Sequence, residues 1–175
     1  MRRILLALTV FPAVLAWACT LPPPPGTLVP PRVEVLEGEA RAVRYGRSAA
    51  EVLRAPALAE SARALFGANW GAAGAGGRGV SAPAPEFFAS AAGAPRVLRV
   101  GGVDWIGVAG CRTGACATHA GVLLVRGDGA VLLARLDDGG FSHYYAFGTG
   151  WSATPEVRLL VDAAWRALGG PPPSR

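Results

Sequence analysis

The chain has 175 residues, a formal net charge of +5 and 51% hydrophobic residues, which suffices for one globular domain. All 17 basic residues are arginine, and those from Arg32 onward stand singly, without interleaved aromatic residues. This distribution does not indicate a nucleic-acid partner, because surfaces that bind nucleic acids concentrate positive charge on one face or in one segment.

The first 18 residues have the pattern of a bacterial secretion signal. Two arginines precede an apolar run over residues 4–17, which is too short to span a bilayer. The run ends in Ala-Trp-Ala at residues 16–18, a small-x-small sequence that permits cleavage just before Cys19. We therefore expect residues 1–18 to be a signal peptide and the protein to be exported to the periplasm.

Cys19 is a candidate for a lipid anchor, because residues 15–19 resemble a bacterial lipobox. The three cysteines would leave one thiol unpaired in an oxidising compartment unless one is lipidated. Residues 19–32 are rich in proline and are expected to form a stiff linker outside the core. We expect a lipoprotein of the outer membrane; the alternative is plain periplasmic secretion, since Trp17 stands where a lipobox has a small residue.

The first half of the domain predicts helices and a flexible loop. Residues 48–66 have helical spacing of apolar residues, with Ser48 as the N-cap, Pro56 as a break and Gly67 as a stop. Residues 74–79 match the glycine pattern of dinucleotide-binding loops, but the prolines that follow prevent the helix which that site requires. We interpret this stretch as a loop.

The second half predicts strands joined by tight turns. Five segments have strand character, namely residues 96–100, 103–109, 120–126, 130–136 and 141–147. Short connections without helices indicate an antiparallel meander and exclude a doubly wound parallel sheet. A closing helix begins at Thr154-Pro155-Glu156 and ends at Gly169.

Together these elements predict a single α+β domain over residues 33–169, followed by a tail over residues 170–175. We expect an antiparallel meander of about five strands with helices packed on one face.

Two groups of residues carry side chains that are capable of catalysis or metal binding. Ser142 and His143 lie near Asp137 and Asp138, but neighbouring strand residues point to opposite faces and cannot form a catalytic triad. The two aspartates precede two glycines and are interpreted as turn formers. We therefore predict that the protein is not an enzyme and has no cofactor; an exported hydrolase that uses His143 is the least favoured alternative.

Cys111 and Cys116 form the second group, together with His119. These three residues could supply zinc ligands, but a C-x₄-C spacing in an oxidising compartment favours a disulfide, so we predict no metal site. Closing about six residues stabilises the fold by only about 2 kcal/mol in the entropic model. Such a ring fixes the shape of a projecting loop and lowers the entropic cost of inserting it into a partner. The alternative is a disulfide that merely staples the end of a hairpin.

Residues 86–168 resemble the inhibitor of vertebrate lysozyme (Ivy) family of bacterial periplasmic proteins. The resemblance rests on Gly-Gly-Val-Asp-Trp-Ile-Gly-Val at residues 101–108, which leads into the loop over residues 111–116, and on the apolar strand, meander and closing helix that follow. The resemblance implies that this loop enters the active-site cleft of a lysozyme, where a histidine of the loop reaches the catalytic carboxylates.

The loop departs from the family pattern Cys-Lys-Pro-His-Asp/Asn-Cys. Arg112 keeps the basic position, whereas Thr113 replaces the proline, Gly114 the histidine and Ala115 the acid or amide. Arg112, or His119 from outside the ring, could substitute for the missing histidine. We predict an inhibitor of a lysozyme or of another cell-wall lytic enzyme; the alternative is an envelope adaptor that binds another protein or a peptidoglycan component.

Overall fold

The computed structural model describes residues 28–71, 79–150 and 153–170. The predicted signal peptide, Cys19, most of the proline-rich linker and the tail beyond Gly170 lie outside the described residues. Within the described ranges, no helix is long and apolar enough to cross a membrane.

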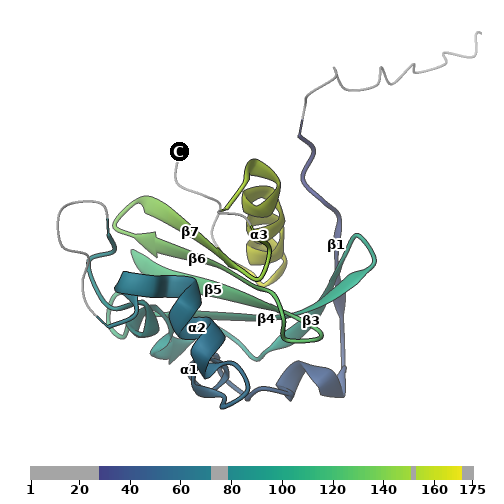
Figure 1. The fold of residues 1–175 in the computed structure, drawn as a ribbon, viewed down its shortest axis with the longest axis horizontal. Coiled ribbons are helices and arrows are strands. Elements are labelled where there is room, and N and C mark those ends of the chain that lie inside the picture. Colours follow the sequence, from purple (N-terminus) through teal and green to yellow (C-terminus); the bar gives the residue numbers. More distant parts are fainter. Residues whose placement is uncertain (1–27, 72–78, 151–152, 171–175) are drawn as a thin grey trace, which may run out of the picture.

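An antiparallel sheet forms the centre of the protein (Figure 1). Its main strands lie in the order β1-β3-β4-β5-β6-β7, and the short strand β2 pairs with β4. The predicted α+β class and the antiparallel meander are confirmed, and β1 and β2 are added to the five predicted strands. The strand bounds are β1 Val33–Leu36, β2 Ser90–Ala91, β3 Arg96–Val100, β4 Val103–Cys111, β5 His119–Arg126, β6 Leu132–Asp138 and β7 Phe141–Phe147.

The predicted helix boundaries are confirmed at the caps. Ser48 accepts a hydrogen bond from the backbone N–H of Glu51 at the start of the first helix, and Gly67 ends the second with a φ of 53°. Thr154 caps the last helix in the same way as Ser48 caps the first. The α-helices are α1 Ala49–Arg54, α2 Ala59–Phe66 and α3 Pro155–Ala167, and the 3₁₀-helices are η1 Ala40–Val43, η2 Gly67–Asn69 and η3 Ala84–Phe88.

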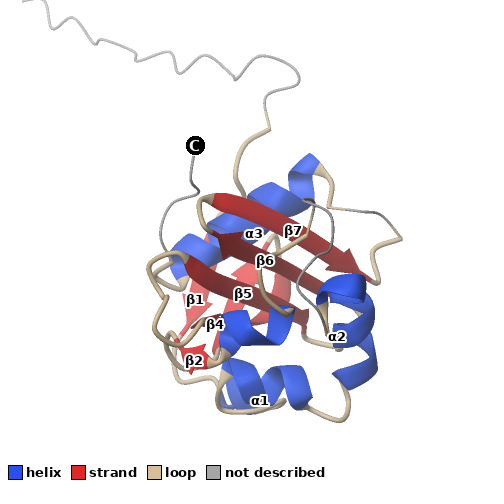
Figure 2. Ribbon diagram, turned by 90° about the vertical axis from the view of Figure 1, so that its left-hand side faces the viewer, coloured by secondary structure: helices blue, strands red, loops and turns tan. Residues whose placement is uncertain are grey.

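Helices cover both faces of the sheet, which corrects the expectation that they pack on one face (Figure 2). Leu123 and Val125 of β5 join a buried cluster with α1, α2 and η3, whereas Val122 and Leu124 join a second cluster with α3. Successive strand residues point to opposite faces, so a strand that is covered on both faces has apolar residues without alternation.

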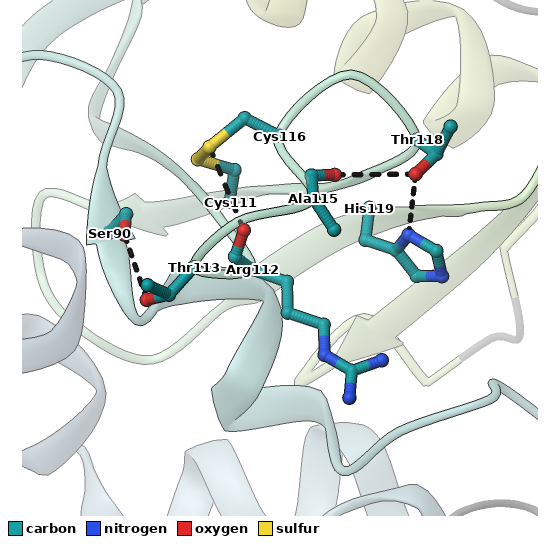
Figure 3. Close-up of a disulfide and its surroundings, with 8 residues drawn as sticks. All are labelled: Ser90, Cys111, Arg112, Thr113, Ala115, Cys116, Thr118 and His119. Atoms are coloured by element: carbon teal, nitrogen blue, oxygen red, sulfur yellow. Dashed lines mark hydrogen bonds between the residues drawn. A yellow bond between two sulfur atoms is a disulfide. The ribbon is translucent and has the colours of Figure 1, made fainter.

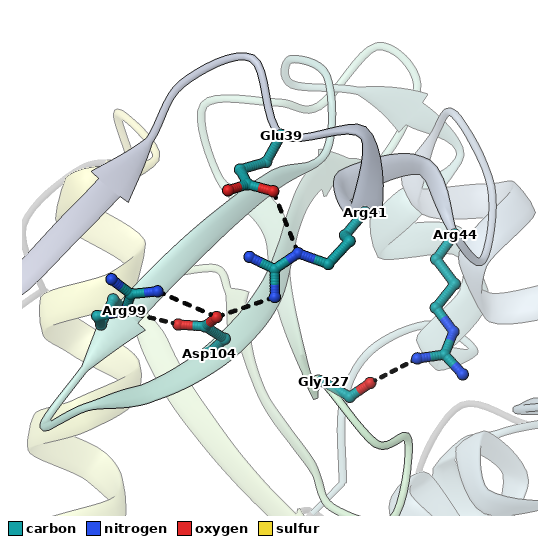
Figure 4. Close-up of polar contacts among 6 residues, drawn as sticks. All are labelled: Glu39, Arg41, Arg44, Arg99, Asp104 and Gly127. Carbon is teal, nitrogen blue, oxygen red and sulfur yellow. Dashed lines mark hydrogen bonds and ion pairs between the residues drawn. The ribbon is translucent and has the colours of Figure 1, made fainter.

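A charged cluster ties the N-terminal segment to the hairpin of β3 and β4 (Figure 4). Asp104 accepts from Arg99 Nε at 2.8 Å and from Arg41 Nη1 at 3.0 Å, and Arg41 Nε also donates to Glu39 at 3.1 Å. The hydrogen bonds from Arg99 and Arg41 lower the pKa of Asp104. Nearby, Arg44 donates to the carbonyl of Gly127 at 2.8 Å. These contacts are exposed and fix the course of the chain more than they stabilise the fold.

Two glycines allow η3 to approach the sheet closely. A Cβ at Gly110 would lie 2.7 Å from the Cα of Phe88, and a Cβ at Gly121 would lie 2.6 Å from the tip of the Phe88 ring. Phe88 is fully buried. Gly110 and Gly121 therefore place η3 beside the end of the β4–β5 hairpin.

Gly110→Ala is expected to lower the free energy of unfolding by about 1–3 kcal/mol, because the new methyl group meets backbone that cannot move independently. Urea denaturation measures the effect. Gly71→Ala is the matched control, since no atom of the described residues lies within 4 Å of a Cβ at this position, and its effect should stay within about 0.5 kcal/mol. Equal effects of the two substitutions would contradict this account of the close approach.

Candidate functional site

The site is the loop that joins β4 to β5 (Figure 3). The predicted disulfide between Cys111 and Cys116 is present, with the two Cα atoms 4.9 Å apart. Cys111 ends β4 and is buried, whereas Cys116 is exposed. The disulfide therefore fastens an exposed loop to the end of a central strand.

Backbone hydrogen bonds add to this closure. Arg112 N donates to the carbonyl of His119 at 2.9 Å, Ala115 N to that of Arg112 at 2.9 Å, and His119 N to that of Ala115 at 2.8 Å. Gly114 has a φ of 78°, a conformation that favours glycine. The loop is thus held in one shape by a covalent ring and by hydrogen bonds at its base.

The tip of the loop is exposed and small. Thr113 and Gly114 are both exposed, and no atom of the described residues lies within 4 Å of the place where a Cβ of Gly114 would stand. The hydroxyl oxygen of Thr113 lies 3.0 Å from that of Ser90 in β2, so one side of the loop is tied to the neighbouring strand. The tip of the loop is therefore exposed and carries no charge.

Arg112 lies at the side of the loop and points away from the disulfide (Figure 3). Its Nε stands 3.3 Å from a carboxylate oxygen of Glu86 in η3, and the two side chains are 42% and 45% exposed. An ion pair this exposed is worth about 1 kcal/mol or less. The guanidinium can therefore turn toward another carboxylate at little cost.

His119 is held at the base of the loop. Its Nε2 lies 3.1 Å from Asp138 at the end of β6, its Nδ1 lies 2.7 Å from the hydroxyl of Thr118, and its ring lies beside Phe87. Both ring nitrogens are thus engaged within the protein. His119 would have to break one of these contacts to take the place of the missing loop histidine.

Asp137 and Asp138, the last two residues of β6, act differently from their predicted role as turn formers. Asp138 accepts hydrogen bonds from the backbone and hydroxyl groups of Ser81, and Asp137 accepts from Arg135 and from Ser142. The turn itself is made by the two glycines that follow, both of which have positive φ. Asp138 therefore connects the base of the loop to the segment before η3.

Asp138 is also expected to make the fold sensitive to acid. Burial raises its pKa, but the hydrogen bonds from Ser81 and the charges of the two histidines outweigh that effect and lower the pKa overall. Its contribution to stability is present above the ordinary carboxyl pKa near 4 and is lost as the pH falls through the lower pKa of the folded state. Between about pH 5 and pH 3, wild-type protein should lose stability more steeply than Asp138→Asn. Urea denaturation at each pH tests this, and parallel curves would contradict it.

Two cavities lie near the loop, and the larger one, of about 340 Å³, is lined by Glu86, the ion-pair partner of Arg112, and by Trp70. The smaller cavity, of about 120 Å³, lies beside the disulfide and is lined by both cysteines, small residues and Trp165 of α3. Pockets that hold small molecules usually measure about 300 Å³ or more. In the described ranges no group of three or more His, Cys, Asp or Glu residues could hold a metal ion.

Several contacts of the site could not be found from the sequence. Glu86, Ser90 and Asp138 are distant from the loop in the chain, and only the packing of η3, β2 and β6 brings them to it. Thr118 is the exception, because a hydroxyl next to a histidine at the end of a loop is a local signal.

Comparison of the chain with protein-family models, with curated proteins and with solved structures found no match.

Proposed function

We propose that the protein is an exported inhibitor of a cell-wall lytic enzyme of the lysozyme type. The loop closed by Cys111 and Cys116 enters the active-site cleft of that enzyme. The observation that carries the proposal is the loop itself, which has small residues at its tip, is exposed and is fixed by a disulfide and by hydrogen bonds. Because its conformational freedom is already lost, inserting it into a cleft has a lower entropic cost.

Arg112 supplies the charge for this contact. Glycoside hydrolases of this type carry two carboxylic residues in the cleft. Gly114 offers no side chain to reach them, but the guanidinium of Arg112 is half-exposed and only weakly paired with Glu86. A charge-assisted hydrogen bond from Arg112 to an enzyme carboxylate would replace the contact of the family's histidine.

The anchor belongs to the same proposal. A lipid on Cys19 would attach the chain to the outer membrane. The loop would then lie close to the membrane surface, where an incoming lytic enzyme arrives. Mass spectrometry of the native N-terminus tests the anchor, and an unmodified Cys19 would rule it out.

A turbidity assay with purified protein tests the inhibition, using bacterial cell walls and lysozymes of several classes. Wild-type protein should slow lysis by at least one class. Arg112→Ala should raise the concentration needed for half-inhibition about tenfold, which corresponds to one charged hydrogen bond. Arg126→Ala is the matched control. Like Arg112, Arg126 is exposed and forms an ion pair with a carboxylate, but it lies at the end of β5 that is remote from the loop.

The outcomes separate two parts of the proposal. No inhibition of any lysozyme class would contradict the function. Equal inhibition by wild-type protein and Arg112→Ala would leave the function standing and contradict the role of Arg112.

The second candidate is an envelope adaptor. The uncharged tip of the loop favours it, because Thr113, Gly114 and Ala115 have no charged side chain that would pair with a catalytic carboxylate. An adaptor would sediment with peptidoglycan or co-purify with another envelope protein while leaving lysis unchanged. The turbidity assay and a sedimentation assay with the same protein therefore distinguish the two candidates.

A further inference from the structure

The two edges of the sheet differ in how they are protected. The edge strand β1 has four residues, includes Glu34 and follows Pro30 and Pro31. The opposite edge strand, β7, has seven residues and no charged residue or proline. Among the described strands it pairs with β6 alone. Charges, prolines and short length are the usual means by which a sheet edge avoids pairing with another chain, and β7 has none of them.

The sequence of β7 is nearly palindromic about Tyr144. It reads Phe-Ser-His-Tyr-Tyr-Ala-Phe over Phe141–Phe147. If two such strands pair antiparallel with Tyr144 at the twofold axis, Phe141 lies opposite Phe147 of the second copy, and His143 lies opposite its Tyr145. These cross-strand pairs are aromatic and therefore favourable. Because β7 has no acidic or basic residue, the pairing also brings no like charges together.

The exposure of Phe141 supports the same pairing. Its side chain is 73% exposed, the largest value among the exposed large hydrophobic residues of the described ranges. Tyr145 and Phe147, which share its face of the strand, pack against the buried cluster beneath α1 and α2. In a single copy the Phe141 ring is left in water, whereas in the pair it gains an aromatic neighbour.

We propose that β7 is a dimerisation edge, at which two copies of this chain pair their β7 strands antiparallel about Tyr144. The occupant is a second copy because the register is self-complementary, as a twofold interface requires. The two sheets become one continuous sheet. The disulfide loop remains uncovered, since it belongs to β4 and β5 in the middle of the sheet, and the dimer presents two loops.

Sedimentation velocity of the purified exported chain over a wide concentration range tests the proposal. Wild-type protein should shift from monomer to dimer as concentration rises. Phe141→Lys should weaken dimerisation by about tenfold or more, because both symmetric aromatic pairs are lost and each edge gains a charge. Val103→Lys is the matched control, since Val103 is another exposed hydrophobic residue, 42% exposed, at the start of β4, and this variant should dimerise like wild type.

Hydrogen exchange of the wild-type protein provides a second measurement that needs no variant. The amides of β7 should exchange more slowly as concentration rises, while those of β1 should not change. A wild-type protein that stays monomeric would overturn the proposal, as would a dimer that Phe141→Lys leaves intact or that Val103→Lys weakens equally. Exchange of β7 that does not depend on concentration would also overturn it.

Discussion

Replacing Arg135 with alanine is expected to lower the free energy of unfolding by about 3–5 kcal/mol, the largest effect on stability that we predict. Arg135 is fully buried in β6. Its Nε and Nη2 donate to the two carboxylate oxygens of Asp137 at 2.8 and 2.7 Å, and its Nη1 donates to Asp162 of α3 at 2.9 Å. Its guanidinium also lies 5.2 Å from the ring centre of Trp165. One side chain thus joins α3 to the sheet.

The loss of stability arises because the substitution leaves two carboxylates without their partner. Asp137 and Asp162 are each only 16% exposed, and both would keep a charge without its cation. The hydroxyl of Tyr144 donates to the same oxygen of Asp162, and burial together with this hydrogen bond raises the pKa of Tyr144 to about 12. The hydroxyl of Tyr144 is neutral when protonated and negative when ionised, so it cannot replace the lost cation.

Thermal unfolding measures the Arg135 prediction directly. A loss of 3–5 kcal/mol corresponds to a decrease in Tm of about 10 °C for a domain of this size. Arg126→Ala removes an exposed arginine–aspartate pair and should change stability by about 1 kcal/mol or less. A decrease in Tm for Arg135→Ala as small as that for Arg126→Ala would show that the buried network does not stabilise the fold.

Replacing both Cys111 and Cys116 with serine is expected to reduce inhibition by about tenfold or more, because the opened loop must be ordered when it binds. The same double substitution should lower the free energy of unfolding by about 2 kcal/mol in the entropic model. The fold should survive this loss, since the hydrogen bonds at the base of the loop and both hydrophobic clusters remain.

The turbidity assay, run well below the Tm of the variant, separates loop order from global unfolding. Wild-type protein treated with a reducing agent should behave like the double variant. If the double variant inhibits as well as wild type, the closed shape of the loop is not what the enzyme recognises.

Local signals in the sequence are sufficient for much of the fold. Thr154 and Pro155 define the start of α3, and tight glycine turns define the hairpins of the meander. The strand β1 gives no such signal, because it has four residues and is separated from its partner β3 by residues 37–95. The local sequence also does not indicate which helix covers each face of the sheet. The apolar residues of β5 indicate burial on both faces, but they do not identify the helix that packs on each face.

The candidate site also combines a feature that the sequence predicts with contacts that depend on the fold. The disulfide follows from the spacing of Cys111 and Cys116, whereas the ion pair of Arg112 with Glu86 depends on how η3 packs against the sheet. The prediction that His119 could act outside the loop took no account of Asp138, which only the pairing of β5 with β6 places beside it. Arg135 was missed because it stands within an apolar strand, although Asp137 two residues later lies on the same face.

The most direct test of the central claim is the binding of wild-type protein to the most strongly inhibited lytic enzyme, measured by titration calorimetry. The titration is repeated with the enzyme's cleft filled by a short N-acetylglucosamine oligosaccharide. Insertion of the Cys111–Cys116 loop into the cleft predicts that the oligosaccharide raises the apparent Kd in proportion to its own concentration. A Kd that the oligosaccharide leaves unchanged would contradict insertion of the loop.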